Sequence, residues 1–192
     1  MPDKNQAALD FLLTRRSRPQ KTLGLPVPDR AELELVLTAA ARTPDHGKLE
    51  PWRFIVLEKP ALTRLAALAQ VRGAALGLEV EQINKGSAQF ATGNLAVVVV
   101  EVQKPSPKVP AIEQTYSAGA VCLALLNAGL AAGWGANWLS GWPSHDREFV
   151  QGGLGLQAHE RVAGIIHLGR EGSVPPERPR PVMDAITTWM DA

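Results

Sequence analysis

The chain has 192 residues, of which 45% are hydrophobic and 20% are charged, and its net charge at pH 7 is +1. This composition is typical of one globular domain with a substantial core, and the near-zero charge excludes a strongly basic nucleic-acid-binding surface. Cys122 is the only cysteine, so the chain cannot form an internal disulfide, which fits a reducing compartment. The first residues lack the apolar stretch of a secretory signal, so we expect a cytoplasmic protein.

Hydrophobic periodicity predicts three helices and one strand in the first half of the chain. In chain order these are a helix over 6–14, a helix from Asp29 to about Ala40, a strand over 53–58 and a helix that begins at Pro60. The second helix has a capping-box start, because Glu32 follows Asp29 by three residues. Residues 71–90 are predicted to be helical, with breaks at Gly73, Gly77 and Gly86.

The second half of the chain contains the most apolar segments. The predicted elements are a buried central strand over 95–100, a loop over 104–110, a long helix from about Ile112, a short strand or loop over 134–138, a short capped helix over 144–149, a strand over 161–168 and a terminal helix or arm over 182–190. Strands that are interleaved with helices indicate a single mixed α/β or α+β domain over residues 1–192.

One segment tests the expectation that the chain does not cross a membrane. Residues 118–136 are apolar or small except for Asn127, which is close to membrane-spanning length. Gly129 and Gly133 have the spacing with which membrane helices pack. Alanine and glycine dominate the segment, however, and no cluster of lysine or arginine flanks it. We therefore predict a buried central helix whose small residues allow close neighbours.

The turn between the second helix and the first strand is unusually constrained and unusually polar. Pro44 and Pro51 bracket Asp45, His46, Gly47, Lys48 and Glu50. Proline fixes φ and removes a donor, so both prolines hold the connection in one shape. A rigid connection rich in polar groups is typical of a binding edge. Trp52 begins an apolar strand and is predicted to belong to the core.

Several standard catalytic sites are not supported. The four histidines are scattered, there is no phosphate-binding loop of the Gly-x4-Gly-Lys type, and Gly133-Trp-Gly135 follows a helix rather than a strand. Cys122 lies in the apolar helix, where a thiol usually acts as a small hydrophobe. Glu113 and Gln114 at the start of that helix are interpreted as helix caps.

What remains is a set of anion-binding and aromatic groups. Arg15, Arg16 and Ser17 follow a helix and could bind a phosphate through charge-assisted hydrogen bonds. Arg42 and His46 could bind a phosphate or a polar ring. Residues 138–141, Trp-Leu-Ser-Gly, offer an aromatic wall beside closely approachable backbone. Phosphate contacts and flat apolar walls without a nucleophile suggest that a bound cofactor carries the chemistry.

Four blocks of sequence resemble the FMN-dependent nitroreductase family, and specifically its small, single-domain NAD(P)H nitroreductases. The blocks are Arg15-Arg16-Ser17, residues 41–46 with 51–54, residues 108–114 with 117–119, and residues 138–141. They follow the family's order and spacing from the N-terminus to about Gly169. The Pro-Asp-His and Pro-Trp-x-Phe motifs of the second block are the most specific.

The resemblance implies an α+β nitroreductase-like fold, with a central mixed or antiparallel sheet flanked by helices, in an interlocked homodimer. It implies one FMN at each of two subunit interfaces. Ile186, Trp189 and Met190, which are at helical spacing near the end of the chain, further predict a C-terminal arm over 175–192 that docks on the partner subunit. The residues it assigns to the cofactor are Arg15, Arg16, Ser17, Arg42, His46, Trp138, Leu139, Ser140, Gly141, Gly169 and Arg170. It assigns no catalytic side chain and no metal, because the flavin carries the reaction.

The implied activity is transfer of hydride from NAD(P)H through FMN to a nitroaromatic, a quinone or a similar conjugated acceptor, in a ping-pong mechanism. Lys48, Glu50 and Pro19 depart from the family pattern, in which asparagine, glutamine and lysine are usual at these positions. Two alternatives therefore remain from the sequence: a flavin-binding carrier or sensor with little turnover, and a dimeric interaction protein without a cofactor.

Overall fold

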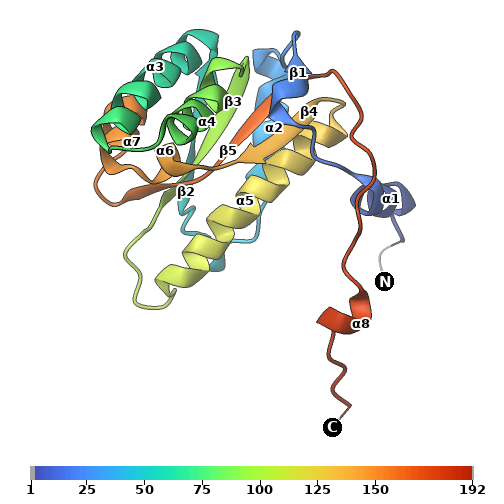
Figure 1. The fold of residues 1–192 in the computed structure, drawn as a ribbon. Helices are drawn as coiled ribbons and strands as arrows, with labels where there is room; N and C mark the ends of the chain where they lie inside the picture. Colours follow the sequence, from blue (N-terminus) through green and yellow to red (C-terminus); the bar gives the residue numbers. More distant parts are fainter. Residues whose placement is uncertain (1–2, 192) are drawn as a thin grey trace.

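The computed structural model describes residues 3–191 as an α+β domain built on one sheet (Figure 1). The strands are β1 (Leu23–Gly24), β2 (Trp52–Glu58), β3 (Leu95–Val102), β4 (Gly135–Leu139) and β5 (Glu160–Glu171). They are ordered β1-β5-β3-β2, with β4 also paired to β5. Every pairing is antiparallel, so the expected central sheet is of the antiparallel kind.

Helices cover both faces of the sheet. The helices are α1 (Gln6–Thr14), α2 (Arg30–Ala40), α3 (Lys59–Ala75), α4 (Val80–Ala91), α5 (Ala111–Ala131), α6 (Trp142–His145), α7 (Arg147–Leu154) and α8 (Met183–Ile186), and the 3-10 turns are η1 (Gln20–Thr22) and η2 (His46–Lys48). The helices α3, α4 and α7 pack on one face, and α2 and α5 pack on the other (Figure 1).

The central strand β3 divides the core into two layers. All eight of its residues are buried. Its even-numbered valines pack with α3, α4 and α7, whereas Val97 and Val99 pack with α2 and α5. Successive side chains of a strand point to opposite faces, so a run of β-branched residues can fill both layers at once. The prediction of a central strand that is buried on both faces is confirmed.

The predicted capping box at the start of α2 is confirmed. Asp29 and Glu32 form both of its hydrogen bonds.

The helix breaks that were predicted in residues 71–90 are largely wrong. Gly73 and Gly86 lie inside α3 and α4, where a Cβ would come within 2.8 Å of Ile83 and 2.1 Å of Trp142. These two glycines therefore allow close packing rather than end a helix. Of the three glycines, only Gly77, with a φ of 65°, lies between the helices.

The end of the chain differs from its prediction in two places. The single helix expected over 144–149 is two helices, because Asp146 ends α6 and its side chain accepts a hydrogen bond from the Phe149 backbone at the start of α7. After β5 the chain leaves the body as an arm, and within its described part, up to residue 191, only Met183–Ile186 is helical (Figure 1). Trp189 and Met190 on this arm are 88% and 87% exposed.

The long helix α5 is the apolar segment that could have been mistaken for a membrane span. Its residues Ala118, Val121 and Leu125 are fully buried against the sheet. Among residues 3–191, no helix combines the length and the hydropathy that crossing a bilayer requires. Gly129 lies where a Cβ would come within 2.6 Å of Leu168, as expected for a small residue at a close helix–sheet contact.

Candidate functional site

The Arg-Arg-Ser motif forms a corner between α1 and the sheet. Arg15 follows the last residue of α1, and its Nη2 donates a 3.0 Å hydrogen bond to Ser17 Oγ. The Arg18 N–H donates to the Ala136 carbonyl at 2.8 Å, and Asn137 Nδ2 donates to the Arg18 carbonyl at 2.6 Å. These bonds hold the corner beside β4, the strand that leads into residues 138–141.

Four arginines gather at this corner, and we call Arg15, Arg16, Arg18 and Arg180 the arginine cluster. Arg18 forms an ion pair with Glu171, and Arg16 and Arg180 lie 3.6 Å and 2.8 Å from Glu177. Four guanidinium groups thus share two carboxylates, which leaves the cluster with a net surplus of two positive charges, and Arg15 has no ion pair with a carboxylate among the described residues. The Nε atom of Arg15 is buried and has no hydrogen-bond acceptor.

The electrostatics of Arg15 reflect this surplus of positive charge. Burial lowers the pKa of Arg15, and the charges of Arg180, Arg16 and Arg18 lower it further. Arg180 has the largest effect of the three, although it is 165 positions away in sequence. The sequence did not predict that Arg180 lies beside Arg15, because only the fold brings the two segments together.

Residues 138–141 lie where β4 leaves the sheet. The Trp138 indole lies over β5 at Gly164, where a Cβ would come within 2.2 Å of Trp138 Nε1. Trp138 is nevertheless 38% exposed, so it forms a partly open aromatic wall as well as packing on the sheet. Leu139, Ser140 and Gly141 line a cavity of about 410 Å³ against α4.

Gln89 of α4 is a site residue that sequence reasoning missed. It lines the same cavity as Ser140 and Gly141, and a Cβ on Gly141 would lie 3.6 Å from Gln89 Nε2. Its Nε2 donates to the Gly86 carbonyl, but its Oε1 is buried without a donor. A buried amide oxygen without a partner is costly, so a ligand that donates to it would be favoured. Nothing in the sequence around Gln89 signals this.

The polar turn is rigid and strained. Lys48 and Glu50 adopt positive φ angles of 53° and 49°, which cost non-glycine residues about 1–3 kcal/mol each. The Asp45 side chain accepts from the Glu50 N–H at 2.7 Å, and His46 Nδ1 lies 2.6 Å from Glu113 Oε2. Glu113 therefore contacts the turn, and the interpretation of Glu113 as a helix cap is wrong. Gln114 also caps nothing, because its amide bonds both backbone groups of Lys104.

Within one chain the turn lies apart from the other predicted site residues. Ser117 Oγ donates to the Pro44 carbonyl at 2.6 Å, which fixes the turn against the N-terminal half of α5. The arginine cluster lies beside β4, which follows the other end of α5. No hydrogen bond or ion pair among the described residues joins His46 or the exposed Arg42 to the cluster or to residues 138–141.

Gly169 and Arg170 lie inside β5 rather than after it, because the strand continues three residues beyond its predicted end at Leu168, to Glu171. Gly169 is buried, and a Cβ there would come within 2.8 Å of the Gly24 carbonyl, which is a packing reason for glycine. The Arg170 side chain is exposed, and its backbone N–H donates to the Pro26 carbonyl at 3.0 Å.

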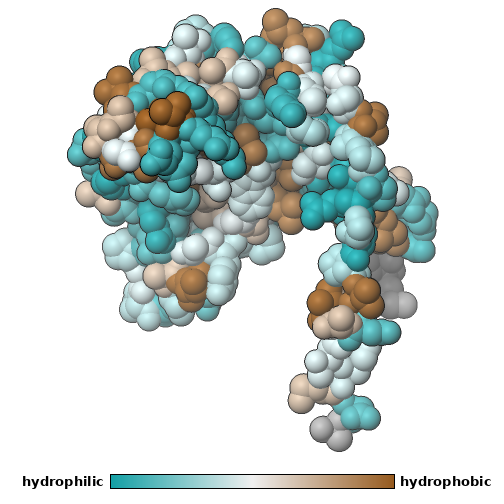
Figure 2. All heavy atoms as spheres, in the orientation of Figure 1, coloured by the Kyte–Doolittle hydropathy of each residue, from teal (hydrophilic) through white to brown (hydrophobic). Residues whose placement is uncertain are grey.

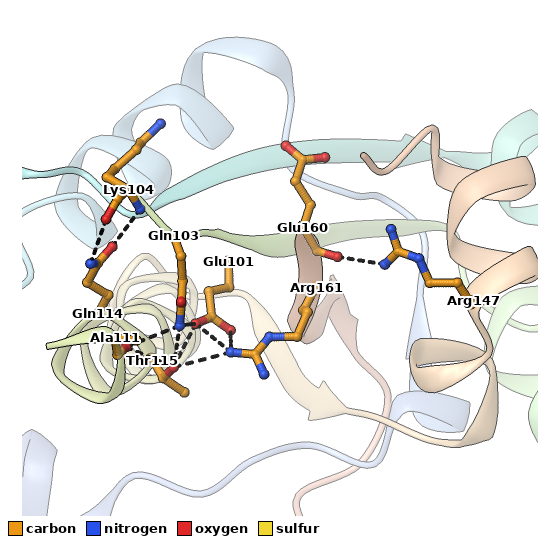
Figure 3. A network of polar contacts seen from close by, with 9 residues as sticks. All are labelled: Glu101, Gln103, Lys104, Ala111, Gln114, Thr115, Arg147, Glu160 and Arg161. Atoms are coloured by element: carbon orange, nitrogen blue, oxygen red, sulfur yellow. Dashed lines mark hydrogen bonds and ion pairs between the residues drawn. The ribbon is translucent and has the colours of Figure 1, made fainter. Parts of the chain in front are cut away.

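A second polar network lies at the opposite end of β5 (Figure 3). Glu101 of β3 is almost fully buried and accepts hydrogen bonds from Thr115, Arg161 and Gln103. Burial would raise the pKa of Glu101, but these hydrogen bonds outweigh burial and lower it. Glu101 and Arg161 line a cavity of about 470 Å³. No group of three metal-ligating side chains occurs among residues 3–191.

Comparison with known proteins relates this fold and these residues to one family. A family model described as "Nitroreductase family" matches residues 13–170. The chain is 32% identical over 162 residues to the Escherichia coli K12 protein named "Putative NAD(P)H nitroreductase YdjA", which covers 84% of this chain and 87% of that protein.

Two solved structures share the fold at low sequence identity. A nitroreductase-like family protein from Bacillus cereus has a TM-score of 0.80 at 20% identity, with both chains fully covered. An FMN-dependent nitroreductase from Clostridium difficile R20291 has a TM-score of 0.66 at 18% identity and covers 89% of this chain and 91% of that chain. The extent of the family match and the identity to the Escherichia coli relative show that the chain belongs to the nitroreductase family, a family of FMN-dependent NAD(P)H oxidoreductases.

Proposed function

We propose that the protein is an NAD(P)H oxidoreductase that passes hydride through FMN to a nitroaromatic, a quinone or a similar conjugated acceptor in a ping-pong cycle. The arginine cluster carries this proposal, because its net surplus of two positive charges and the orphaned Arg15 Nε suit a phosphate monoester. Such a group carries a charge of about −1.5 to −2 at pH 7 and offers three strong acceptor oxygens.

The residues around β4 suit the rest of an FMN molecule. Arg15, Arg16 and Ser17 would hold the phosphate and the ribityl chain, with help from Arg180. Residues 138–141 would lie along the flavin, and Gln89 Oε1 would accept a hydrogen bond from a ring N–H. The orphaned Gln89 oxygen lines the cavity formed by Ser140 and Gly141, so the cavity has both an apolar wall and an unused polar anchor.

Bound FMN supplies the chemistry that no side chain here provides, which is acceptance and donation of hydride. The chain binds the cofactor, orients it against Trp138 and Leu139, and excludes bulk water from one side of the ring. Positive charge at the arginine cluster fixes the phosphate end, so that the ring end is held in one orientation. Positioning of this kind is how a protein accelerates a reaction that a cofactor performs.

We further propose a homodimer in which the partner subunit completes each site. Arg42 and His46 lie apart from the arginine cluster within one chain, so they can reach a shared cofactor only from a second copy. The arm supports the same arrangement, because Ile186, Trp189 and Met190 are mostly exposed on a segment that leaves the body (Figure 2). Exposed apolar residues on a projecting segment are typical of an interface, and we assign the arm, residues 175–192, to the partner's surface.

The proposal is tested by cofactor binding and by turnover. The double variant Arg15→Ala, Ser17→Ala should bind FMN about tenfold to a hundredfold more weakly, because charge-assisted hydrogen bonds to the phosphate are lost. Binding of riboflavin, which has no phosphate, should change little. Arg30→Ala is the matched control, because Arg30 is 93% exposed and pairs with Glu34 on its own helix, away from the arginine cluster. Unchanged FMN affinity in the double variant would refute the assignment of the phosphate site.

Turnover distinguishes an enzyme from a carrier. Anaerobic addition of NADH or NADPH to the FMN-loaded protein should bleach its visible spectrum, and a quinone or nitroaromatic should restore the spectrum within catalytic times. A yellow protein that bleaches slowly or not at all would favour a flavin-binding carrier or sensor. Protein that fails to take up FMN would favour an interaction protein without a cofactor.

A further inference from the structure

The chain that follows β5 contacts the arginine cluster of its own subunit through residues 176–180, the first part of the arm, before the apolar end of the arm projects from the body. Figure 1 shows this segment running beside the chain that leaves α1. Arg16 Nη1 donates to the Pro176 carbonyl and lies 3.6 Å from the Glu177 carboxylate. Arg180 Nη2 lies 2.8 Å from the same carboxylate oxygen. We call residues 172–180, which carry these contacts, the strap.

Glu177 is the group of the strap that the cluster binds. Its carboxylate is shared between Arg16 and Arg180, which come from opposite ends of the chain. The backbone N–H of Arg178 donates to it and lowers the pKa of Glu177, and the charges of Arg180 and Arg16 lower the pKa further. Glu177 is therefore an anion at neutral pH. It stands among guanidinium groups, as a bound phosphate would.

We propose that the Glu177 carboxylate competes with the phosphate of the cofactor for Arg16 and Arg180. In the free protein Glu177 binds these two arginines, and it leaves them when a phosphate monoester binds. The inference rests on the proposed function, because it takes the arginine cluster as the phosphate site. It adds that the affinity of this site is set by an acidic residue of the strap as well as by the arginines.

The energetics of the contacts favour exchange. The Glu177 and Arg180 side chains are 63% and 51% exposed, and exposed ion pairs contribute little to stability. A phosphate monoester brings up to twice the charge of a carboxylate and three acceptor oxygens, so it forms more charge-assisted hydrogen bonds with the same arginines. Glu177 and the phosphate repel each other if both stay, so binding of one weakens binding of the other.

The position of Glu177 explains how exchange could occur without unfolding of the domain. The strap lies after β5, and none of its residues is fully buried. Pro175, Pro176 and Pro179 restrict its backbone, so residues 175–180 can move as a stiff unit while β5 keeps its pairing. Arg180 is three residues from Glu177 and moves on the same segment, which lets it turn from the carboxylate to the phosphate.

The test compares FMN with riboflavin in the full-length protein. Glu177→Gln should bind FMN about twofold to fivefold more tightly than the wild type, which is the range of an exposed ion pair, and should bind riboflavin equally well. Inorganic phosphate, added as a competitor, should weaken FMN binding by the wild type and the variant and should leave riboflavin binding unchanged. Glu34→Gln is the matched control, because Glu34 is also an exposed carboxylate paired with arginine but lies on α2, where we expect no effect.

Equal or weaker FMN binding by Glu177→Gln would overturn the inference. It would mean that Glu177 holds Arg180 in position rather than competing with the phosphate. Arg16→Ala and Arg180→Ala separate this failure from failure of the proposed function. If both arginine variants lose FMN affinity while Glu177→Gln gains none, the phosphate site stands and only the competition is wrong. If neither arginine variant loses affinity, the phosphate lies elsewhere and both proposals are wrong. Far-ultraviolet circular dichroism checks that each variant is folded.

Discussion

Replacement of Glu160 by glutamine should destabilise this domain, because it removes a buried negative charge that pairs with Arg53. Glu160 begins β5 and is only 4% exposed. Arg53 binds it through two parallel bonds of 2.7 Å and 2.8 Å, and the Gln157 N–H donates to the same carboxylate at 2.8 Å. The hydrogen bonds from Arg53 lower the pKa of Glu160 from 4.5 to about 2.

The magnitude follows from the linkage between protonation and folding. A difference of this size between the unfolded and the native pKa corresponds to about 3 kcal/mol, and the partly exposed Arg53 reduces this to about 2–3 kcal/mol. Because the native pKa is the lower one, the stabilisation is fully present above about pH 4.5 and is lost as the pH falls through 2. Glu160→Gln should therefore lower the free energy of unfolding at pH 7 and have progressively less effect in acid.

Urea unfolding at several values between pH 7 and pH 3, followed by tryptophan fluorescence, measures this difference directly. Other carboxylates, such as Asp146 with its lowered pKa, titrate in both proteins and cancel in the comparison. Glu148→Gln is the control, because Glu148 is 72% exposed beside Arg72, and we expect it to cost less than about 0.5 kcal/mol. A difference between wild type and Glu160→Gln that stays constant from pH 7 to pH 3 would refute the reasoning.

Two further variants test the interior beside the candidate site. Burial lowers the pKa of His167 from 6.5 to about 4, and both ring nitrogens are buried without partners. The free energy of unfolding of the wild type, measured in urea, should therefore fall by about 3 kcal/mol between pH 6.5 and pH 4. His167→Leu should not show this fall. An unchanged acid loss would contradict this. Gly164→Ala should displace the Trp138 indole, change the tryptophan emission spectrum and weaken FMN binding, whereas Gly152→Ala, which has open space around its Cβ, should do neither.

The sequence was informative where structure depends on neighbouring residues. The continuous apolar run of β3, the capping box at Asp29 and the helix over residues 6–14 all arise from local rules, and each was predicted and found. Gly73 and Gly86 show where local rules fail. Glycine is a weak helix former, so a break was the natural prediction, but each of these glycines is required by a side chain that approaches from another helix.

The candidate site was predictable as residue types but not as an arrangement. Arg15, Arg16 and Ser17 were identified from their motif, whereas Arg180 and Glu177 join them only because the chain returns after β5. Gln89 lies in an ordinary helical sequence, and what distinguishes it is an amide oxygen that burial leaves without a donor. Both facts depend on contacts between distant segments, which no window of sequence contains.

The strained turn gives an independent argument that each site needs a second subunit. Two non-glycine residues in left-handed conformations persist only where the surroundings hold them, and here Asp45, Ser117 and Glu113 do so. The result within one chain is a fixed His46 on the open side of α5, next to Tyr116, which is 69% exposed. The turn is strained although it makes no contact with the other predicted site residues of its own chain. This strain is explained if the turn faces the cofactor site of a second copy. Gel filtration of the protein with and without FMN should therefore give a dimer in both states, and a monomer that still binds FMN tightly would remove this explanation for the turn.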